Sequence, residues 1–187
     1  GYTYDGGDHY FKFQVDTIDN IYFPREGHTV EFRWDGVRKV LGAESNFDQF
    51  SLAGGFASSW GDGTLLGAVK LGYTPNDDAP IHDHYRLGGF MRMSGLRKAQ
   101  LQGQQSAFLM AGYMQRIYRN PLFPVYGGVT LEAGNTWESF DDIQDLLFAG
   151  SLFLGSDTPL GPLYLAYGYA EGGQQSVYLV LRQQWFD

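Results

Sequence analysis

The chain has 187 residues, enough for one domain with a hydrophobic core, and it has no cysteine, which excludes a disulfide framework, a thiolate metal site and a cysteine nucleophile. The formal net charge of −8 argues against nucleic acid as a partner. With 26 glycines, 17% aromatic residues and only 18% charged residues, the composition favours β-sheet over a helical or α/β soluble enzyme.

Apolar and polar residues alternate along most of the chain. In the second such segment Val30, Phe32 and Trp34 alternate with Glu31 and Arg33. A period of two residues is the pattern of a β-strand whose two faces meet different surroundings. The pattern predicts nine strands, at residues 10–17, 29–35, 49–57, 63–73, 104–118, 125–136, 146–156, 162–170 and 176–186.

Most of these segments run about nine or more residues, the length that a strand needs to cross a bilayer at a tilt. One face of the segments is apolar and aromatic, whereas the other face carries Lys12, Asp16, Glu31, Arg33, Asp35, Lys70 and Glu132. Lipid outside and water or a polar plug inside would produce this division. We therefore predict an all-β fold, an antiparallel transmembrane β-barrel with about 8–10 visible strands, in preference to a soluble sandwich or lipocalin-like barrel.

The connections between the predicted strands are of two kinds. Short turns lie on one rim, at residues 19–27, 60–63, 119–124 and 157–161, and longer segments lie on the other, at 41–46, 74–103, 137–145 and 171–175. Outer-membrane barrels have short periplasmic turns and long outer loops, so we expect a periplasmic C-terminus. Nine strands then leave the N-terminus on the outer rim. Either residues 2–4 begin another strand, or residues 1–187 are the C-terminal part of a larger barrel.

Five short segments resemble, in order, motifs of the barrel domain of the bacterial surface antigen superfamily, which includes the outer-membrane protein assembly factor and the two-partner secretion transporters. They are Asp-Thr-Ile-Asp-Asn at 16–20, Phe-Pro-Arg-Glu-Gly at 23–27, Leu-Gly-Gly-Phe at 87–90, Met-Ser-Gly-Leu at 93–96 and Leu-Glu-Ala-Gly-Asn-Thr-Trp at 131–137. The resemblance covers nearly the whole chain. It implies that the chain is the C-terminal part of a 16-stranded barrel.

The resemblance also implies site residues in the long loop 74–103 and on a later strand. The loop motif comprises Gly88, Gly89, Arg92, Ser94 and Gly95, and the strand motif comprises Glu132 and Gly134. In the assembly and secretion branches an Arg occupies the position of Ser94 and points into the lumen toward an acidic residue. We hypothesise that Glu132 anchors the folded-in loop through Ser94, Arg92 or Arg97. The alternative is that Glu132 is one of several lumen charges.

The segments 87–96 and 153–165 together resemble the C-terminal barrel of outer-membrane patatin-like phospholipases, in which a lipid acyl hydrolase precedes the barrel. The chain itself has no Gly-x-Ser-x-Gly elbow, because the serines of Gly-Phe-Ala-Ser-Ser at 55–59 are misplaced and lie in a predicted strand. We therefore expect a non-enzymatic barrel that anchors, or forms a pore for, a lipase domain. The alternatives are a protein translocation or insertion pore and a small outer-membrane hydrolase.

The last predicted strand ends in aromatic residues and is similar to the terminal-strand signal read by the outer-membrane assembly machinery. Its residues are Tyr178, Trp185 and Phe186, although an interfacial aromatic girdle would give the same pattern. The expected partners are outer-membrane lipid, lipopolysaccharide, the assembly machinery and a second copy of the chain. We expect no cofactor, and we expect the loop residues His82, Asp83 and His84, with Asp77 and Asp78, to be solvated and not to bind metal.

Overall fold

The computed structural model describes residues 8–41, 46–77, 79–120 and 123–186. Nine strands in these residues form one antiparallel sheet in chain order: β1 (Asp8–Asp16), β2 (Gly27–Val37), β3 (Phe47–Trp60), β4 (Gly63–Tyr73), β7 (Gln105–Tyr118), β8 (Val125–Trp137), β9 (Leu147–Thr158), β10 (Gly161–Ala170) and β11 (Gln174–Leu181). The short strands β5 (Tyr85–Leu87) and β6 (Leu101–Gly103) pair with each other inside the long loop. The all-β, antiparallel prediction is confirmed.

The remaining regular elements are four single-turn 3-10 helices: η1 (Lys39–Leu41), η2 (Pro75–Asp77), η3 (Ile81–Asp83) and η4 (Phe140–Asp142). They all lie in the connections of the long-loop rim. No helix of the described residues is long and apolar enough to cross a membrane.

The nine predicted strands match the nine strands of the sheet, and β4 has the predicted bounds. The prediction is wrong at the last strand, which was expected to reach residue 186 but ends at Leu181. The chain turns there because Arg182 adopts a φ of 61° and its N–H donates to the carbonyl of Pro162 at 2.7 Å. The expectation of a strand at residues 2–4 lies outside the described residues.

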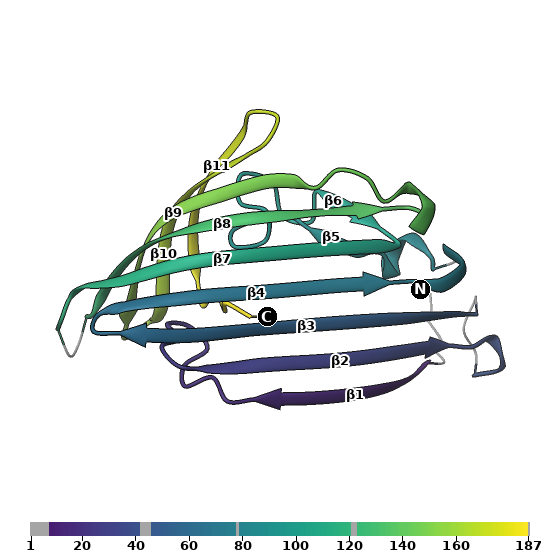
Figure 1. The fold of residues 1–187 in the computed structure, drawn as a ribbon, viewed down its shortest axis with the longest axis horizontal. Helices are drawn as coiled ribbons and strands as arrows, with labels where there is room; N and C mark the ends of the chain where they lie inside the picture. The colour runs from purple at the N-terminus through teal and green to yellow at the C-terminus, as the bar shows by residue number, and fades with distance from the viewer. Residues whose placement is uncertain (1–7, 42–45, 78, 121–122, 187) are drawn as a thin grey trace.

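The sheet is strongly curved, and the long loop and the C-terminal segment lie on its concave side (Figure 1). Strands β1 and β11 are the two edges of the sheet. Because each strand is antiparallel to the next and the sheet has nine strands, β1 and β11 run in the same direction. Pairing these two edges directly would therefore make a parallel seam in an otherwise antiparallel sheet.

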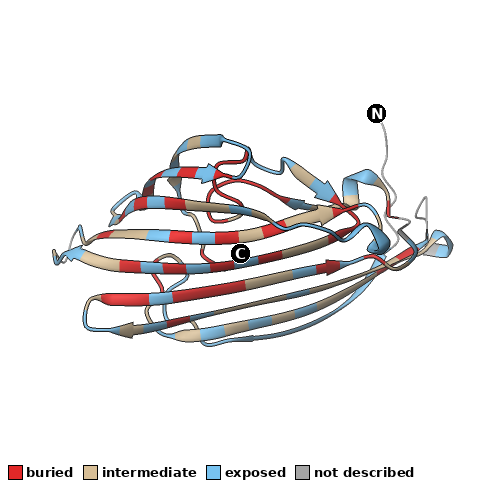
Figure 2. Cartoon of the chain, turned by 45° about the horizontal axis from the view of Figure 1, so that its top comes forward, coloured by how far each residue is buried: buried red, intermediate tan, exposed pale blue. Residues whose placement is uncertain are grey.

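The convex face of the sheet is apolar and exposed. Exposed and buried residues alternate along the strands, most regularly on β7 and β10 (Figure 2). The exposed set includes Phe11, Phe32, Leu109, Leu131, Phe148, Leu152 and Leu179. An apolar face of this extent is what a lipid-facing wall requires.

The concave face is divided into a polar half and an apolar half, which the sequence pattern did not predict. On β1 and β2 the inward side chains include Lys12 and Glu31, which form an ion pair at 2.7 Å. On β4 and β7–β10 the inward side chains form a hydrophobic core, with Leu66, Met114 and Tyr164 almost fully buried. The long loop and the C-terminal segment, instead of water, cover this half, so its apolar side chains are buried.

The short turns and the longer connections lie on opposite rims, as expected (Figure 1). Two connections differ in size from the others on their rim. The segment between β1 and β2 is long because it folds inward and buries Phe23 and Pro24. The connection between β10 and β11 is only the three residues 171–173.

Candidate functional site

The tip of the long loop, residues 88–96, lies on the concave side of the sheet and is almost completely buried. Met93 and Ser94 are 0% exposed, and Met91 and Leu96 are nearly so. Gly88, with a φ of +128°, permits the turn into the tip, where its N–H donates to the carbonyl of Arg92 at 2.7 Å. A Cβ at Gly88 would lie 2.3 Å from a backbone oxygen, so this position requires glycine.

Glu132 on β8 is the centre of the contacts that hold this tip, and it is 3% exposed. The backbone N–H of Ser94 donates to Oε2 of Glu132 at 2.6 Å, and the Ser94 hydroxyl donates to Oε1 at 2.7 Å. The hydroxyl of Thr130 also donates to Oε1, at 2.6 Å. Since the Thr130 proton is used there, the Ser151 hydroxyl 2.7 Å away donates to Thr130. Three hydrogen bonds from neutral donors thus compensate the burial of the carboxylate.

The contact expected between Glu132 and Ser94 is therefore present. The other two candidate partners on the loop lie elsewhere: Arg97 is exposed, and Arg92 lines a chamber beside the tip. Gly134, the second residue of the strand motif, makes room for the neighbouring strand, because a Cβ there would lie 2.8 Å from the carbonyl oxygen of Ala107.

The tip also sits directly on the backbone of β10, where two glycines meet. A Cβ at Gly95 would lie 2.5 Å from the backbone nitrogen of Ala170, and a Cβ at Gly168 would lie 2.6 Å from the backbone nitrogen of Gly95. The loop thus approaches the sheet more closely than side chains would permit. The loop motif predicted a role for Gly95. Gly168 was missed, and only its inward position on the alternating strand could have indicated it.

The sequence matches the model of the Omp85 superfamily domain over residues 8–182. The chain belongs to the Omp85 superfamily. Comparison with curated proteins gives no match. The match confirms the predicted surface-antigen superfamily and identifies an outer-membrane β-barrel protein. Membership in the Omp85 superfamily implies a role in insertion or translocation at the outer membrane.

The C-terminal segment of the chain, after β11, turns into the hydrophobic core. Trp185 is 3% exposed and its indole Nε1–H donates to the Tyr164 hydroxyl at 3.0 Å. The Tyr164 hydroxyl in turn donates to the carbonyl of Tyr22, and Phe23 stacks on the Tyr164 ring with centroids 5.0 Å apart. Trp185 therefore joins the C-terminal segment to the inward turn between β1 and β2. The predicted role of Tyr178, Trp185 and Phe186 as an assembly signal stays a prediction.

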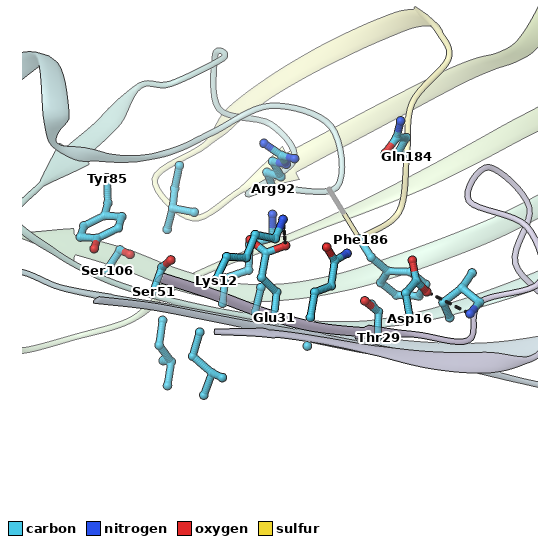
Figure 3. A pocket seen from close by; sticks show the side chains of 18 of the residues that line it. Lys12, Asp16, Thr29, Glu31, Ser51, Tyr85, Arg92, Ser106, Gln184 and Phe186 are labelled. Carbon is cyan, nitrogen blue, oxygen red and sulfur yellow. Dashed lines mark hydrogen bonds and ion pairs between the residues drawn. The ribbon is translucent and has the colours of Figure 1, made fainter. Parts of the chain in front are cut away.

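A chamber of about 560 Å³ separates the polar half of the concave face from the loop (Figure 3). Lys12, Asp16, Thr29, Glu31 and Ser51 line it from β1–β3, and Arg92, Gln184 and Phe186 line it from the opposite side. Tyr85 lies at one end, where burial raises its pKa to about 12. The chamber carries both charge signs, and it lies on the concave side of the sheet, where the lumen of a closed barrel would be.

The described residues contain no group of three or more His, Asp or Glu side chains arranged to bind a metal ion. His82 and Asp83 approach each other at 3.3 Å, and His84 Nε2 lies 3.1 Å from the carbonyl oxygen of Ala79. Asp78 lies outside the described residues.

Proposed function

We propose that this chain is the membrane wall that anchors a patatin-like lipase domain lying outside residues 1–187, and that its translocation role serves that domain. In this proposal the chain contributes no catalytic group, and hydrolysis belongs to the other domain. The observation that carries the proposal is the contact between the Glu132 carboxylate and Ser94, a donor without charge. The assembly and secretion branches are expected to place an Arg at this position.

The physical argument concerns how the lumen is closed. An arginine can exchange a carboxylate for water and remain solvated when the loop moves out. The Ser94 contact instead depends on a tip that is buried on all sides, with Met93 and Leu96 in the hydrophobic core. Withdrawal of the tip would expose this apolar surface and leave the Glu132 carboxylate with fewer donors. If the tip always covers this half of the lumen, the structure fits an anchor better than a pore through which polypeptides pass repeatedly.

We further propose that strands outside the nine described here close the barrel, to a total of 16. Two observations support this: both edges of the sheet are unpaired in the described residues, and β1 and β11 run in the same direction. An all-antiparallel closure requires an odd number of additional strands, and an unpaired edge inside a bilayer is costly. In this barrel the convex face contacts lipid and lipopolysaccharide, and the assembly machinery inserts the chain.

A protein translocation or insertion pore is the second candidate. The chamber beside the tip favours it, because Lys12, Glu31 and Arg92 provide a polar surface along which a polypeptide could pass. The two candidates require different neighbouring domains: a lipase domain for the first, periplasmic receptor domains for the second.

The test is to isolate the native polypeptide from outer membranes and measure its intact mass and its phospholipid hydrolysis. The anchor proposal predicts a polypeptide whose mass exceeds 21.0 kDa by a lipase domain and the additional strands, with hydrolysis that is lost when the lipase domain is removed by protease. A polypeptide with receptor domains, no hydrolysis, and secretion or insertion of a second protein would contradict the anchor and support the pore.

A further inference from the structure

Within the part of the chain that the structure describes, the last strand, β11, pairs with β10 alone. The outward residues of β11 are exposed, with Val177 and Leu179 more than 70% accessible. Three of the inward residues, in contrast, contact the long loop.

Three successive inward residues of β11 form hydrogen bonds with the loop. The Tyr178 hydroxyl accepts from the N–H of Gly95 and donates to the carbonyl of Leu96, both at 2.9 Å. The Ser176 hydroxyl donates to the carbonyl of Gly95 at 2.9 Å. Nearer the turn, Nε2 of Gln100 donates to Oε1 of Gln174 at 2.7 Å. These contacts form a second set of anchors, on a different strand from Glu132.

Packing strengthens the contact between the tip and β11. The rings of Phe90 and Tyr178 lie 5.7 Å apart, and Tyr178 packs against the hydrophobic core. A Cβ at Gly95 would lie 2.9 Å from the carbonyl oxygen of Gln174. The tip is therefore held between β8 on one side and β10 and β11 on the other.

We propose that Tyr178 is a positioning residue that couples the loop to the terminal strand, so that release of the tip from Glu132 also releases β11. The inference rests on the proposed role of the loop in closing the lumen, and deepens it. Within residues 94–96, Ser94 is hydrogen-bonded to Glu132, and the next two residues are hydrogen-bonded to Tyr178. A tip that moves away from β8 cannot keep its contacts with β11, because both sets involve adjacent residues of one tight turn.

The experiment measures hydrogen–deuterium exchange of the native polypeptide in lipid nanodiscs, comparing Glu132→Gln and Tyr178→Phe with the wild type. Each net hydrogen bond lost is expected to speed local exchange by roughly 2- to 12-fold. Glu132→Gln should speed exchange in residues 91–97, the segment that contacts Glu132 directly through Ser94. It should also speed exchange in residues 176–180 of β11, whose link to Glu132 runs through the tip. Tyr178→Phe should speed exchange at Ser94, whose acceptor Glu132 is unchanged. Ser94→Ala repeats the first measurement if Glu132→Gln does not fold.

The matched control is Tyr167→Phe. The Tyr167 hydroxyl donates to Oε1 of Gln175 at 2.7 Å, so this variant removes a hydrogen bond from the same β10–β11 hairpin on the convex face. It should leave exchange in the loop unchanged. Faster exchange of the tip with unchanged exchange of β11 in Glu132→Gln would overturn the coupling and leave the loop anchor intact. Unchanged exchange of both would overturn the anchor as well, whereas the lipase proposal is judged separately by the hydrolysis test.

Discussion

At the scale of single residues, we expect Glu132 to hold the loop on the concave side of the sheet. Its carboxylate accepts three hydrogen bonds from neutral donors, two of them from Ser94. A hydrogen bond to a charged group contributes about 1.5–3 kcal/mol, roughly twice the contribution of a neutral one. Replacing the carboxylate by an amide removes the charge and places an NH₂ group where an acceptor is needed.

We therefore expect Glu132→Gln to free the loop and allow trypsin to cleave after Arg92, which is partly buried within the tip. The measurement is limited proteolysis of the folded protein in detergent, followed by mass spectrometry. Glu26→Gln is the control, because Glu26 is exposed and lies in the turn between β1 and β2, and it should behave as wild type. Unchanged resistance of the loop in Glu132→Gln would show that the carboxylate is one lumen charge among several.

Gly168→Ala tests the close approach of the tip to β10. The added methyl group would lie 2.6 Å from the backbone nitrogen of Gly95 and 2.8 Å from Cβ of Ser94. Overpacking of this kind costs about 1–3 kcal/mol, so the midpoint of urea unfolding in lipid vesicles should fall. Gly127→Ala should change it little, because its nearest neighbour, Cδ2 of Leu154, is 3.5 Å away. Equal midpoints for the two variants would exclude a tightly seated tip.

At the scale of elements, the C-terminal segment does not continue β11 but packs against the concave side of the sheet. Trp185 lies in the hydrophobic core, with its ring 5.5 Å from that of Phe153. Truncation of a buried Trp costs about 3–5 kcal/mol. We expect Trp185→Ala to lower the unfolding free energy by that amount, measured by urea titration in vesicles. Trp60→Ala, which truncates a 58% exposed ring, should cost less. The reverse order would contradict the inward position of the C-terminus.

In the turn between β3 and β4, the Asp62 carboxylate forms ion pairs with Arg116 and Arg119 at the end of β7. Hydrogen bonds from Arg119, and then from Arg116, lower the pKa of Asp62 below its usual value of 3.8. The ionised form is favoured in the folded state, so this stabilisation is present above the unfolded pKa and is lost as pH falls through the lower folded pKa. Thermal unfolding below about pH 4 should therefore weaken the wild type more than Asp62→Asn. Parallel pH profiles would exclude this contribution.

The sequence predicted the strands well because the period-two pattern is a local signal. It predicted the loop tip and Glu132 through motif resemblance. It did not predict β5 and β6, the inward C-terminal segment or the hydrogen bonds of Tyr178 with the loop, since these depend on tertiary contacts and not on a local period. The hydrogen bonds of Tyr178, for example, join residues about 80 positions apart. The inward faces of β7–β10 looked like a lumen wall, and only the tertiary fold reveals that the loop covers them.

At the scale of the whole molecule, the edges of the sheet decide how this Omp85 domain is completed. The edge strand β1 has exposed residues on both faces along all nine positions, and its outward side chains include Phe11, Phe13 and Val15. Unpaired edges in a bilayer leave backbone groups without hydrogen-bond partners. The chain alone should therefore associate through its edges, whereas the native polypeptide should close with its own additional strands.

The most direct test of this account is the protein mass of the folded, detergent-solubilised 187-residue chain, measured by light scattering. The account predicts a particle of two or more 21.0 kDa copies that requires detergent, because nine strands supply only part of a membrane wall. A detergent-bound monomer would mean that the nine strands close alone. A monomer that stays soluble in water without detergent would contradict the membrane wall itself.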